Sequence, residues 1–224
     1  MSPCVVSVNV ATPRAAAWAE PLGCTAIDKR PVDGRVRVDT LGLQGDQVAD
    51  VKHHGGLHQA VYAFAREDID LWAERLGRPI RSGQFGENVT TRGIDVNEAL
   101  LGERWAIGTT VFEVAEVRIP CNVFKNWMGA SGFDNARWVK RFTAEGRPGP
   151  YLRVVQPGEI GAGDELIVVH KPDHEVTISL MFRAFTSDRS LLPRLLEVGE
   201  SLAPNPRAAA ERHAARTQSQ PQQS

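Results

Sequence analysis

The amino-acid sequence predicts a mainly β protein, a β-barrel or sandwich with inserted helices. Most of the chain consists of short β-branched or aromatic runs separated by turns rich in Gly, Pro and Asp, which is typical of such folds. Strands and helices do not alternate regularly, which argues against a doubly wound parallel sheet. With 42% hydrophobic and 24% charged residues over 224 positions, the chain can bury a full core without disulfides or metal staples.

Seven strands are expected, and the strongest is Thr110–Ile119. Its apolar side chains fall on both faces, as in a strand that is buried on two sides. An Asp33-Gly34 step is a strong turn signal before the run at 35–38. The expected strands are 5–10, 25–29, 35–38, 59–64, 110–119, 151–156 and 165–170.

Two helices should interrupt these strands. Glu67–Leu76 has acidic residues in its first turn and Gly77 beyond its end. Phe133–Glu145 has Asp134 as a candidate N-cap and a glycine stop after it. After Lys171-Pro172 the pattern changes, and two further helices are expected at 176–185 and 190–201.

These elements predict three regions. Residues 1–170 form the barrel domain, and residues 171–203 form a short C-terminal helical segment. Residues 204–224 are rich in Ala, Arg, Gln and Ser, and this composition predicts a disordered tail.

Composition also excludes several classes of function. A formal net charge of −1 favours neither nucleic-acid nor membrane-surface binding, so the expected partner is a small-molecule substrate. The three cysteines lack the spacing of a disulfide framework, and reduced thiols suggest a cytoplasmic protein. The N-terminus does not read as a signal peptide, and no apolar run reaches the length of a membrane span. Walker, dinucleotide-binding, nucleophile-elbow and Cys-x-x-Cys motifs are all missing.

The main chemical candidate is Cys121, which follows the longest expected strand. Pro120 cannot donate to a sheet ladder, so it should end that strand and leave Cys121 near the barrel mouth. Arg118 and Lys125 are cationic neighbours, which favour the thiolate form that binds metals. The alternative is a small buried hydrophobic residue, the role of most cysteines.

Two further segments could bind a ligand. His54, Gly55 and Gly56 allow a tight turn whose amides could hold a phosphate, or they are simply a turn with solvated histidines. Zinc bound by His54 and His58 would lack further ligands nearby in the sequence. The Asn88 amide could form hydrogen bonds with the edge of a pterin, or it could hydrogen-bond to its own backbone in a turn.

Taken together, these segments resemble the MOSC family, named for the C-terminal domain of molybdenum cofactor sulfurases. The match is to its small stand-alone bacterial branch, the YiiM-like proteins, and covers about residues 25 to 170, with the helical segment to about 200 also similar. Each motif alone is weak, but their common order makes chance similarity improbable. The matching segments are Leu-Gly-Leu-Gln-Gly-Asp at 41–46, Ala-Asp at 49–50, His-Gly-Gly at 54–56, Phe-Gly-Glu-Asn at 85–88, Arg-Ile-Pro-Cys at 118–121, Tyr-Leu-Arg-Val at 151–154 and Pro-Gly at 157–158.

The resemblance implies a MOSC-type β-barrel that binds a molybdenum cofactor (molybdopterin), with Cys121 as catalytic residue and metal ligand. It implies that Lys52, His54, Gly55, Gly56 and Asn88 bind the cofactor, with Arg118 and Arg153 as partners of the pterin phosphate. A pyridoxal-phosphate domain, found in larger relatives, does not fit in this chain. Three cysteines cannot build an iron–sulfur domain, so electrons should come from a separate donor protein.

Three functions compete at this point. The first is a molybdenum-dependent reductase of N-hydroxylated compounds, a substrate class that the resemblance alone implies. The second is a carrier of sulfur or cofactor, with a persulfide on Cys121 and no turnover. The third is a non-catalytic binding barrel in which Cys121 is structural. The sequence does not determine the physiological substrate, the electron donor, the form of the pterin or the oligomeric state.

Overall fold

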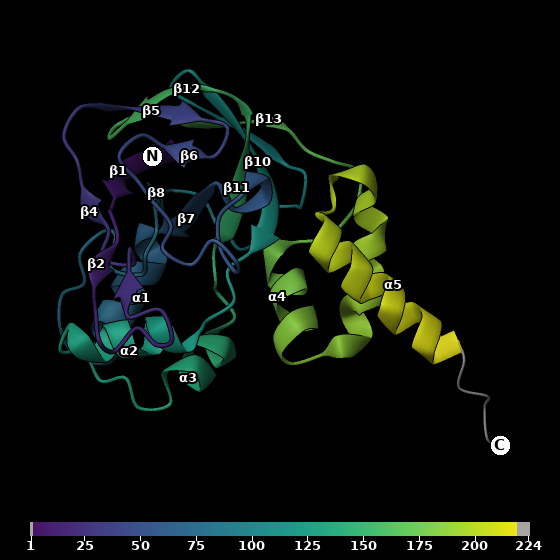
Figure 1. Ribbon diagram of the computed structural model, residues 1–224. Coiled ribbons are helices and arrows are strands. Elements are labelled where there is room, and N and C mark those ends of the chain that lie inside the picture. The colour runs from purple at the N-terminus through teal and green to yellow at the C-terminus, as the bar shows by residue number, and fades with distance from the viewer. Residues whose placement is uncertain (1, 219–224) are drawn as a thin grey trace.

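The computed structural model in Figure 1 describes residues 2–218. Its largest feature is an eight-stranded mixed sheet with the strand order β13-β9-β10-β11-β7-β8-β1-β4. The strands of this sheet are β1 (Cys4–Val10), β4 (Arg30–Pro31), β7 (Val61–Ala65), β8 (Val89–Arg92), β9 (Arg104–Ile107), β10 (Thr110–Val117), β11 (Pro150–Gln156) and β13 (Leu166–His170). Two small sheets join β12 (Gly158–Gly161) with β5 (Arg35–Asp39) and β6 (Gly42–Leu43), and β2 (Arg14–Ala15) with β3 (Cys24–Thr25).

The helices fall into two groups in Figure 1. One group lies below the sheet and consists of α1 (Arg66–Leu76), α2 (Asn122–Ala130) and α3 (Trp138–Glu145). The other lies beside the sheet and consists of α4 (Ile178–Thr186), the 3₁₀ segment η2 (Arg189–Ser201) and α5 (Pro204–Gln218). A short 3₁₀ turn, η1 (Leu57–Gln59), precedes β7.

The sheet curls until β1, the strand next to its β4 end, touches the start of β13 at the other end, but it does not close. Cys4 in β1 forms an isolated bridge with Glu165, and the Leu166 N–H donates to the Pro3 carbonyl at 2.9 Å. Within residues 2–218 this contact between β1 and β13 does not extend into a continuous ladder. The strand before β13, β12, pairs with β5 in a separate sheet. The prediction of a mainly β closed barrel is therefore confirmed only in part, as an eight-stranded mixed sheet with helices.

Several expectations about single elements need correction. β7, α1 and β8 form a parallel crossover unit, although no such unit was expected. The helix expected from Phe133 begins only at Trp138, because Asp134 Oδ1 accepts from the Ala136 N–H in a local turn and Arg137 adopts φ 52°. The helix α2 was not predicted at all, and neither were β8, β9 and β12.

The predicted disordered tail is helical over 204–218. Runs of alanine in this segment have the highest helix propensity, and Ala210 is fully buried in the helical group. The Arg207 guanidinium also donates to the Gly199 carbonyl of η2. The rest of the predicted tail, 219–224, lies outside the described residues.

The core beneath the sheet is rich in aromatic side chains. Phe85 is fully buried, lies 4.9 Å from the Phe64 ring and contacts the rings of Trp72, Phe124 and Phe142. Part of the 85–88 motif, predicted from the sequence as a ligand-binding segment, therefore belongs to the hydrophobic core. In the described part of the chain, no helix has the length and apolarity needed to cross a membrane.

Replacing Phe85 with alanine should destabilise the protein by about 3–5 kcal/mol, because a large side chain is removed from a packed interior. Urea denaturation would measure this loss. Val51, which is 82% exposed, provides the control, since Val51→Ala should change stability by less than about 0.5 kcal/mol. A loss below about 1 kcal/mol for Phe85→Ala would contradict the packing seen here.

Candidate functional site

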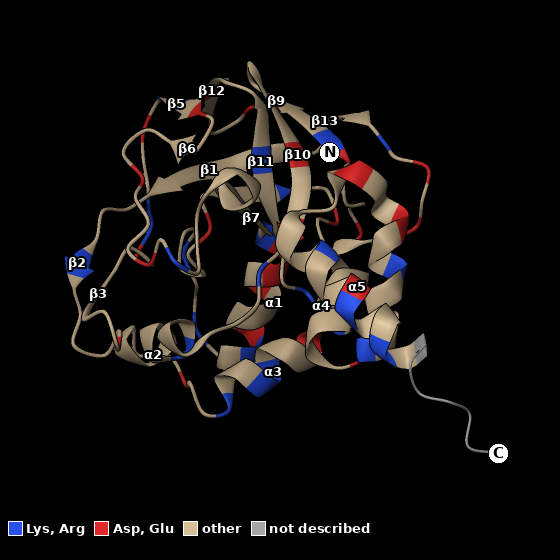
Figure 2. Cartoon of the chain, turned by 45° about the vertical axis from the view of Figure 1, so that its right-hand side comes forward, with Lys and Arg blue, Asp and Glu red and all other residues tan. Residues whose placement is uncertain are grey.

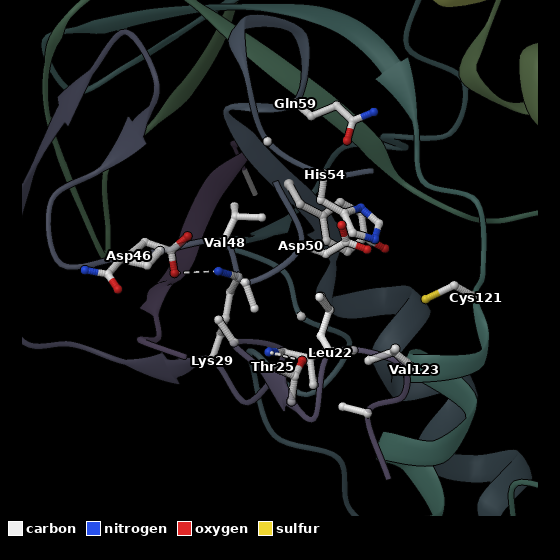
Figure 3. Close-up of a pocket in the computed structure, with 18 of the residues that line it drawn as sticks. Leu22, Thr25, Lys29, Asp46, Val48, Asp50, His54, Gln59, Cys121 and Val123 are labelled. Carbon is white, nitrogen blue, oxygen red and sulfur yellow. Dashed lines mark hydrogen bonds and ion pairs between the residues drawn. The ribbon is translucent and has the colours of Figure 1, made fainter. Parts of the chain in front are cut away.

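A cavity opens between the sheet, the loops around residues 19–27 and 46–55, and the start of α2 (Figure 3). Its volume is about 870 Å³, including space that is open to solvent. Its wall contains five of the predicted site residues: His54, Gly55, Asn88, Arg118 and Cys121. Lys52, Gly56 and Arg153 do not line it.

The floor of the cavity is a row of side chains across one face of the sheet. Tyr151 in β11 pairs with Tyr62 in β7, and their rings lie 5.3 Å apart. The Asn88 N–H donates to the Tyr62 carbonyl at 2.8 Å and continues the row. On the other side Tyr151 pairs with Glu116, next to a bulge in β10. Directly paired residues point to the same face, so the strand register brings these side chains together.

Cys121 lies where β10 gives way to α2. The strand ends at Val117, and Pro120 separates it from the cysteine, as the sequence predicts. Cys121 has extended backbone angles, φ −124° and ψ 171°, and is the N-cap residue of α2. A helix N-terminus carries partial positive charge, which favours an anion such as a thiolate.

The environment of Cys121 stabilises its thiolate. Burial by itself raises the pKa of the thiol, but hydrogen bonding to His54, the charge of Arg118 and the main-chain N–H of Phe124 outweigh it. Together they lower the pKa from 9.0 to about 6. The thiolate is therefore the main form of Cys121 at neutral pH, and it is the form that ligates soft metals.

Arg118 is a buried partner of this thiolate. One guanidinium nitrogen lies 3.9 Å from Cys121 Sγ, and another donates to the Ile119 carbonyl at 2.8 Å. The guanidinium carbon lies 6.0 Å from the centre of the Tyr62 ring, within range of a cation–π contact. Arg118 thus contacts the sulfur of Cys121 directly. The sequence predicts it only as a partner of the pterin phosphate.

The glycine turn places His54 over the cavity. Gly55 and Gly56 adopt φ of 80° and 77°, which favour glycine, so the predicted tight turn is confirmed. His54 Nδ1 lies 3.5 Å from the Tyr151 hydroxyl, and the imidazole faces the Cys121 side in Figure 3. Lys52 is exposed, and its N–H donates to Asp50 Oδ1 at 3.2 Å.

Arg153 has a different partner from the one expected. Its guanidinium lies 2.8 Å from Glu113 Oε1, and Arg104 binds the other oxygen of that buried carboxylate at 2.9 Å. Figure 2 shows neighbouring blue and red bands on β11 and β10. Since a buried carboxylate needs charged partners, Arg153 stabilises the sheet outside the cavity wall.

Asn88 reaches the cavity with its amide already engaged. Its Oδ1 accepts from the Tyr62 N–H at 3.1 Å, and its Nδ2 donates to Asp46 Oδ2 at 2.9 Å and to the Asn9 carbonyl at 3.3 Å. These bonds join Asn88 to three other segments of the chain. In this structure Asn88 therefore positions Asp46 and is not bound to its own turn.

The sequence interpretation missed the residues opposite Cys121. Lys29 forms a buried ion pair with Asp46, which also accepts from the Ala11 N–H at 2.8 Å (Figure 3). Burial lowers the pKa of Lys29, while Asp46 opposes this shift. Asp46 belongs to the recognised 41–46 motif, but no local signal marked Lys29, Tyr62, Tyr151 or Gln59 as cavity residues.

The donor set of the cavity fits a soft metal that brings most of its own ligands. Across residues 2–218, no three His, Cys, Asp or Glu side chains are grouped closely enough to hold an ion by themselves. Cys121 offers a single thiolate beside a cation, and a molybdenum–dithiolene group needs only one such protein sulfur. The residues present therefore fit ligation of a molybdenum cofactor through Cys121.

Comparison with known proteins identifies the family. The MOSC domain model matches residues 50–167, which is more than half of the chain. This chain belongs to the MOSC domain family. The MOSC segment includes the glycine turn, the long strand and Cys121, while the rest of the cavity wall comes from residues 19–29 and 46–49 before it.

Relatives of this MOSC protein support the same assignment. It is 27% identical over 179 residues to the uncharacterized protein YflK of Bacillus subtilis (strain 168), covering 80% of this chain and 79% of YflK. It is 32% identical over 152 residues to a reductase of Gibberella moniliformis (strain M3125 / FGSC 7600), covering 66% of this chain but only 26% of the reductase. The crystal structure of YiiM from Geobacillus stearothermophilus superimposes with a TM-score of 0.76 at 25% identity, covering 94% of this chain and 98% of that one. The fold is therefore YiiM-like.

Proposed function

We propose that this MOSC protein is an oxidoreductase that reduces N-hydroxylated compounds with molybdenum ligated by Cys121. The observation that carries the proposal is the position of Cys121, which is the N-cap of α2, lines the cavity beside His54 and lies 3.9 Å from the Arg118 guanidinium. The reductase relative supports the reaction class, although this chain spans only about a quarter of its length.

When bound, the molybdenum cofactor would supply two-electron, oxygen-atom chemistry. Cys121 Sγ would hold the metal, and Arg118, 3.9 Å from that sulfur, would balance its negative charge. His54 hydrogen-bonds to that sulfur, and its Nδ1 lies 3.5 Å from the Tyr151 hydroxyl, so these two side chains form a path for a proton toward Cys121. The overall reduction of R–NHOH to R–NH₂ consumes two electrons and two protons and releases water, so these proton carriers suit the reaction.

In this proposal a separate protein donates the electrons. The chain contains three cysteines, and only Cys24 and Cys121 line the cavity among the described residues. This number cannot build an iron–sulfur cluster of the Cys₄ type. A small-molecule substrate and a protein donor are thus the expected partners.

Protein purified from a host that makes the cofactor should contain molybdenum and a releasable fluorescent pterin, and should reduce 6-hydroxylaminopurine to adenine when given a reductant. Metal analysis, pterin release and chromatography of the product would measure this. Lys171→Gln is the control, because Lys171 is exposed and lies outside the cavity wall. It should retain both cofactor and activity.

The outcomes separate the competing functions. Protein that remains inactive after cofactor loading would refute the reductase. The sulfur-carrier alternative uses the same thiolate, and it predicts a mass increase of about 32 Da on Cys121 that reductant removes. A molybdenum-loaded protein that lacks the adduct and forms product would favour the reductase, because a cofactor carrier would be loaded but would not turn over substrate.

A further inference from the structure

Gln59 presents an unpaired acceptor to the cavity. It is the last residue of η1, and its side chain lines the cavity. Its Oε1 atom is buried and has no hydrogen-bond partner within the described residues. Buried polar atoms in folded proteins are nearly always paired, and an exception marks a strained site or a missing partner such as a ligand.

Glu116 determines which end of the Gln59 amide faces the cavity. Gln59 Nε2 donates to Glu116 Oε2 at 2.8 Å. A carboxylate can only accept hydrogen bonds, so the amide must turn its NH₂ group toward Glu116 and its oxygen away. In Figure 3 the oxygen of Gln59 is on the side of His54, and the nitrogen points away from it.

The strand register holds this arrangement in place. Glu116 follows the bulge in β10 and pairs with Tyr151, whose hydroxyl lies 3.5 Å from His54 Nδ1. Gln59 therefore lies on the same wall of the cavity as the groups around Cys121. Gln59 and Cys121 both line the cavity, so a ligand large enough to span it can reach both residues.

We infer that Gln59 Oε1 is a recognition site for a ligand N–H, with Glu116 as the residue that positions the amide. This inference deepens the proposed function and rests on it for the identity of the ligand. The N–H can come from the pterin of the cofactor or from the nitrogen-containing substrate and its amine product. The chemistry is the same for both sources. Each source carries an N–H donor, and neither Gln59 nor Glu116 needs to change its charge to receive it.

The test compares Gln59→Met, which keeps the length of the side chain and removes the amide, with wild type. Gln47→Met is the matched control, because Gln47 lines the same cavity but is exposed. Two quantities are measured in each protein: the pterin and molybdenum content, and the affinity for adenine and 6-methylpurine by calorimetry. 6-Methylpurine has a methyl group in place of the donor amine.

The source of the N–H decides which quantity changes. If the cofactor is the source, Gln59→Met should lose pterin content by about tenfold, the loss expected for one hydrogen bond to a buried acceptor. If the amine is the source, pterin content stays unchanged and the affinity for adenine falls about tenfold, while that for 6-methylpurine does not. A fall for both purines assigns the donor to a ring nitrogen. Unchanged pterin content and unchanged affinities would overturn the inference.

Glu116→Gln tests the positioning role. A glutamine at 116 can also donate, so the Gln59 amide is free to turn over. If the amine is the source of the N–H, the affinity for adenine relative to 6-methylpurine should fall, and if the cofactor is the source, the pterin content should fall. A purely structural role would lower the thermal midpoint and leave both quantities unchanged. Wild-type protein that binds pterin or adenine but forms no product refutes the reductase and leaves this test valid. Wild-type protein that binds neither overturns the inference as well.

Discussion

Replacing Cys121 with serine is expected to lower the molybdenum and pterin content of the purified protein by at least about tenfold while the fold persists. A hydroxyl is a hard, neutral ligand at neutral pH, whereas the thiolate is soft and charged. Even the loss of an outer-shell partner lowers metal affinity by about ten- to a hundredfold, so loss of the ligand itself should do at least as much. Metal analysis and pterin release measure the effect.

The position of Cys121 makes this variant easy to interpret. Serine is a preferred N-cap residue, and Cys121 is the N-cap of α2, so Cys121→Ser should keep the helix, and its thermal midpoint should match that of wild type near pH 6, where the thiolate adds little stability. Cys24→Ser is the control, since Cys24 lines the same cavity from β3. Equal molybdenum in wild type and Cys121→Ser would refute the ligand role, and equal losses in both variants would point to a general effect of thiols.

Alkylation of Cys121 by iodoacetamide should show a midpoint near pH 6 in the metal-free protein, because the pKa of this thiol is lowered from 9.0 to about 6. At pH 6 about half of the thiol is then ionised, compared with about one part in a thousand for an ordinary cysteine. The experiment uses protein with Cys4 and Cys24 replaced by serine, and mass spectrometry follows the adduct. Replacing His54 with leucine should move the midpoint upward, since it removes a hydrogen bond to the sulfur.

The same shift predicts the direction of a stability change. The thiolate is favoured in the folded state, so its contribution is fully present above the pKa of the unfolded chain, near 9, and is lost as the pH falls toward 6. The free energy of unfolding of wild type relative to Cys121→Ser should therefore decrease from pH 9 to pH 6. A constant difference, or an alkylation midpoint near 9, would show that His54 and Arg118 do not stabilise the thiolate.

The elements that the sequence predicted well are those with strong local patterns. The long strand, the first helix and the glycine turn all appear within a few residues of their predicted positions. The helix α2 escaped prediction because Asn122–Ala130 contains Gly129 and lacks a usual capping residue. It forms because Phe124 and Met128 are buried in the core, and such tertiary packing outweighs weak local propensity.

The residues of the candidate site also fall into those that the sequence could place together and those that only the fold brings together. Cys121 and Arg118 are three residues apart, so the sequence could place them together at a strand end. The pairs Lys29–Asp46 and Gln59–Glu116 join different segments, and only the folded chain brings them together. The direction of Arg153 depended on Glu113 across the sheet, a partner that no pattern along one strand reveals.

By itself, the sequence determined the nearly neutral net charge of this protein, the order of its MOSC motifs and the position of Cys121 beyond a strand end. Only the tertiary structure decided how acidic that cysteine is and which groups face it. Electrostatic effects depend on distance and burial, and His54, Arg118 and the start of α2 approach the sulfur only when the loop, the strand and the helix are folded together.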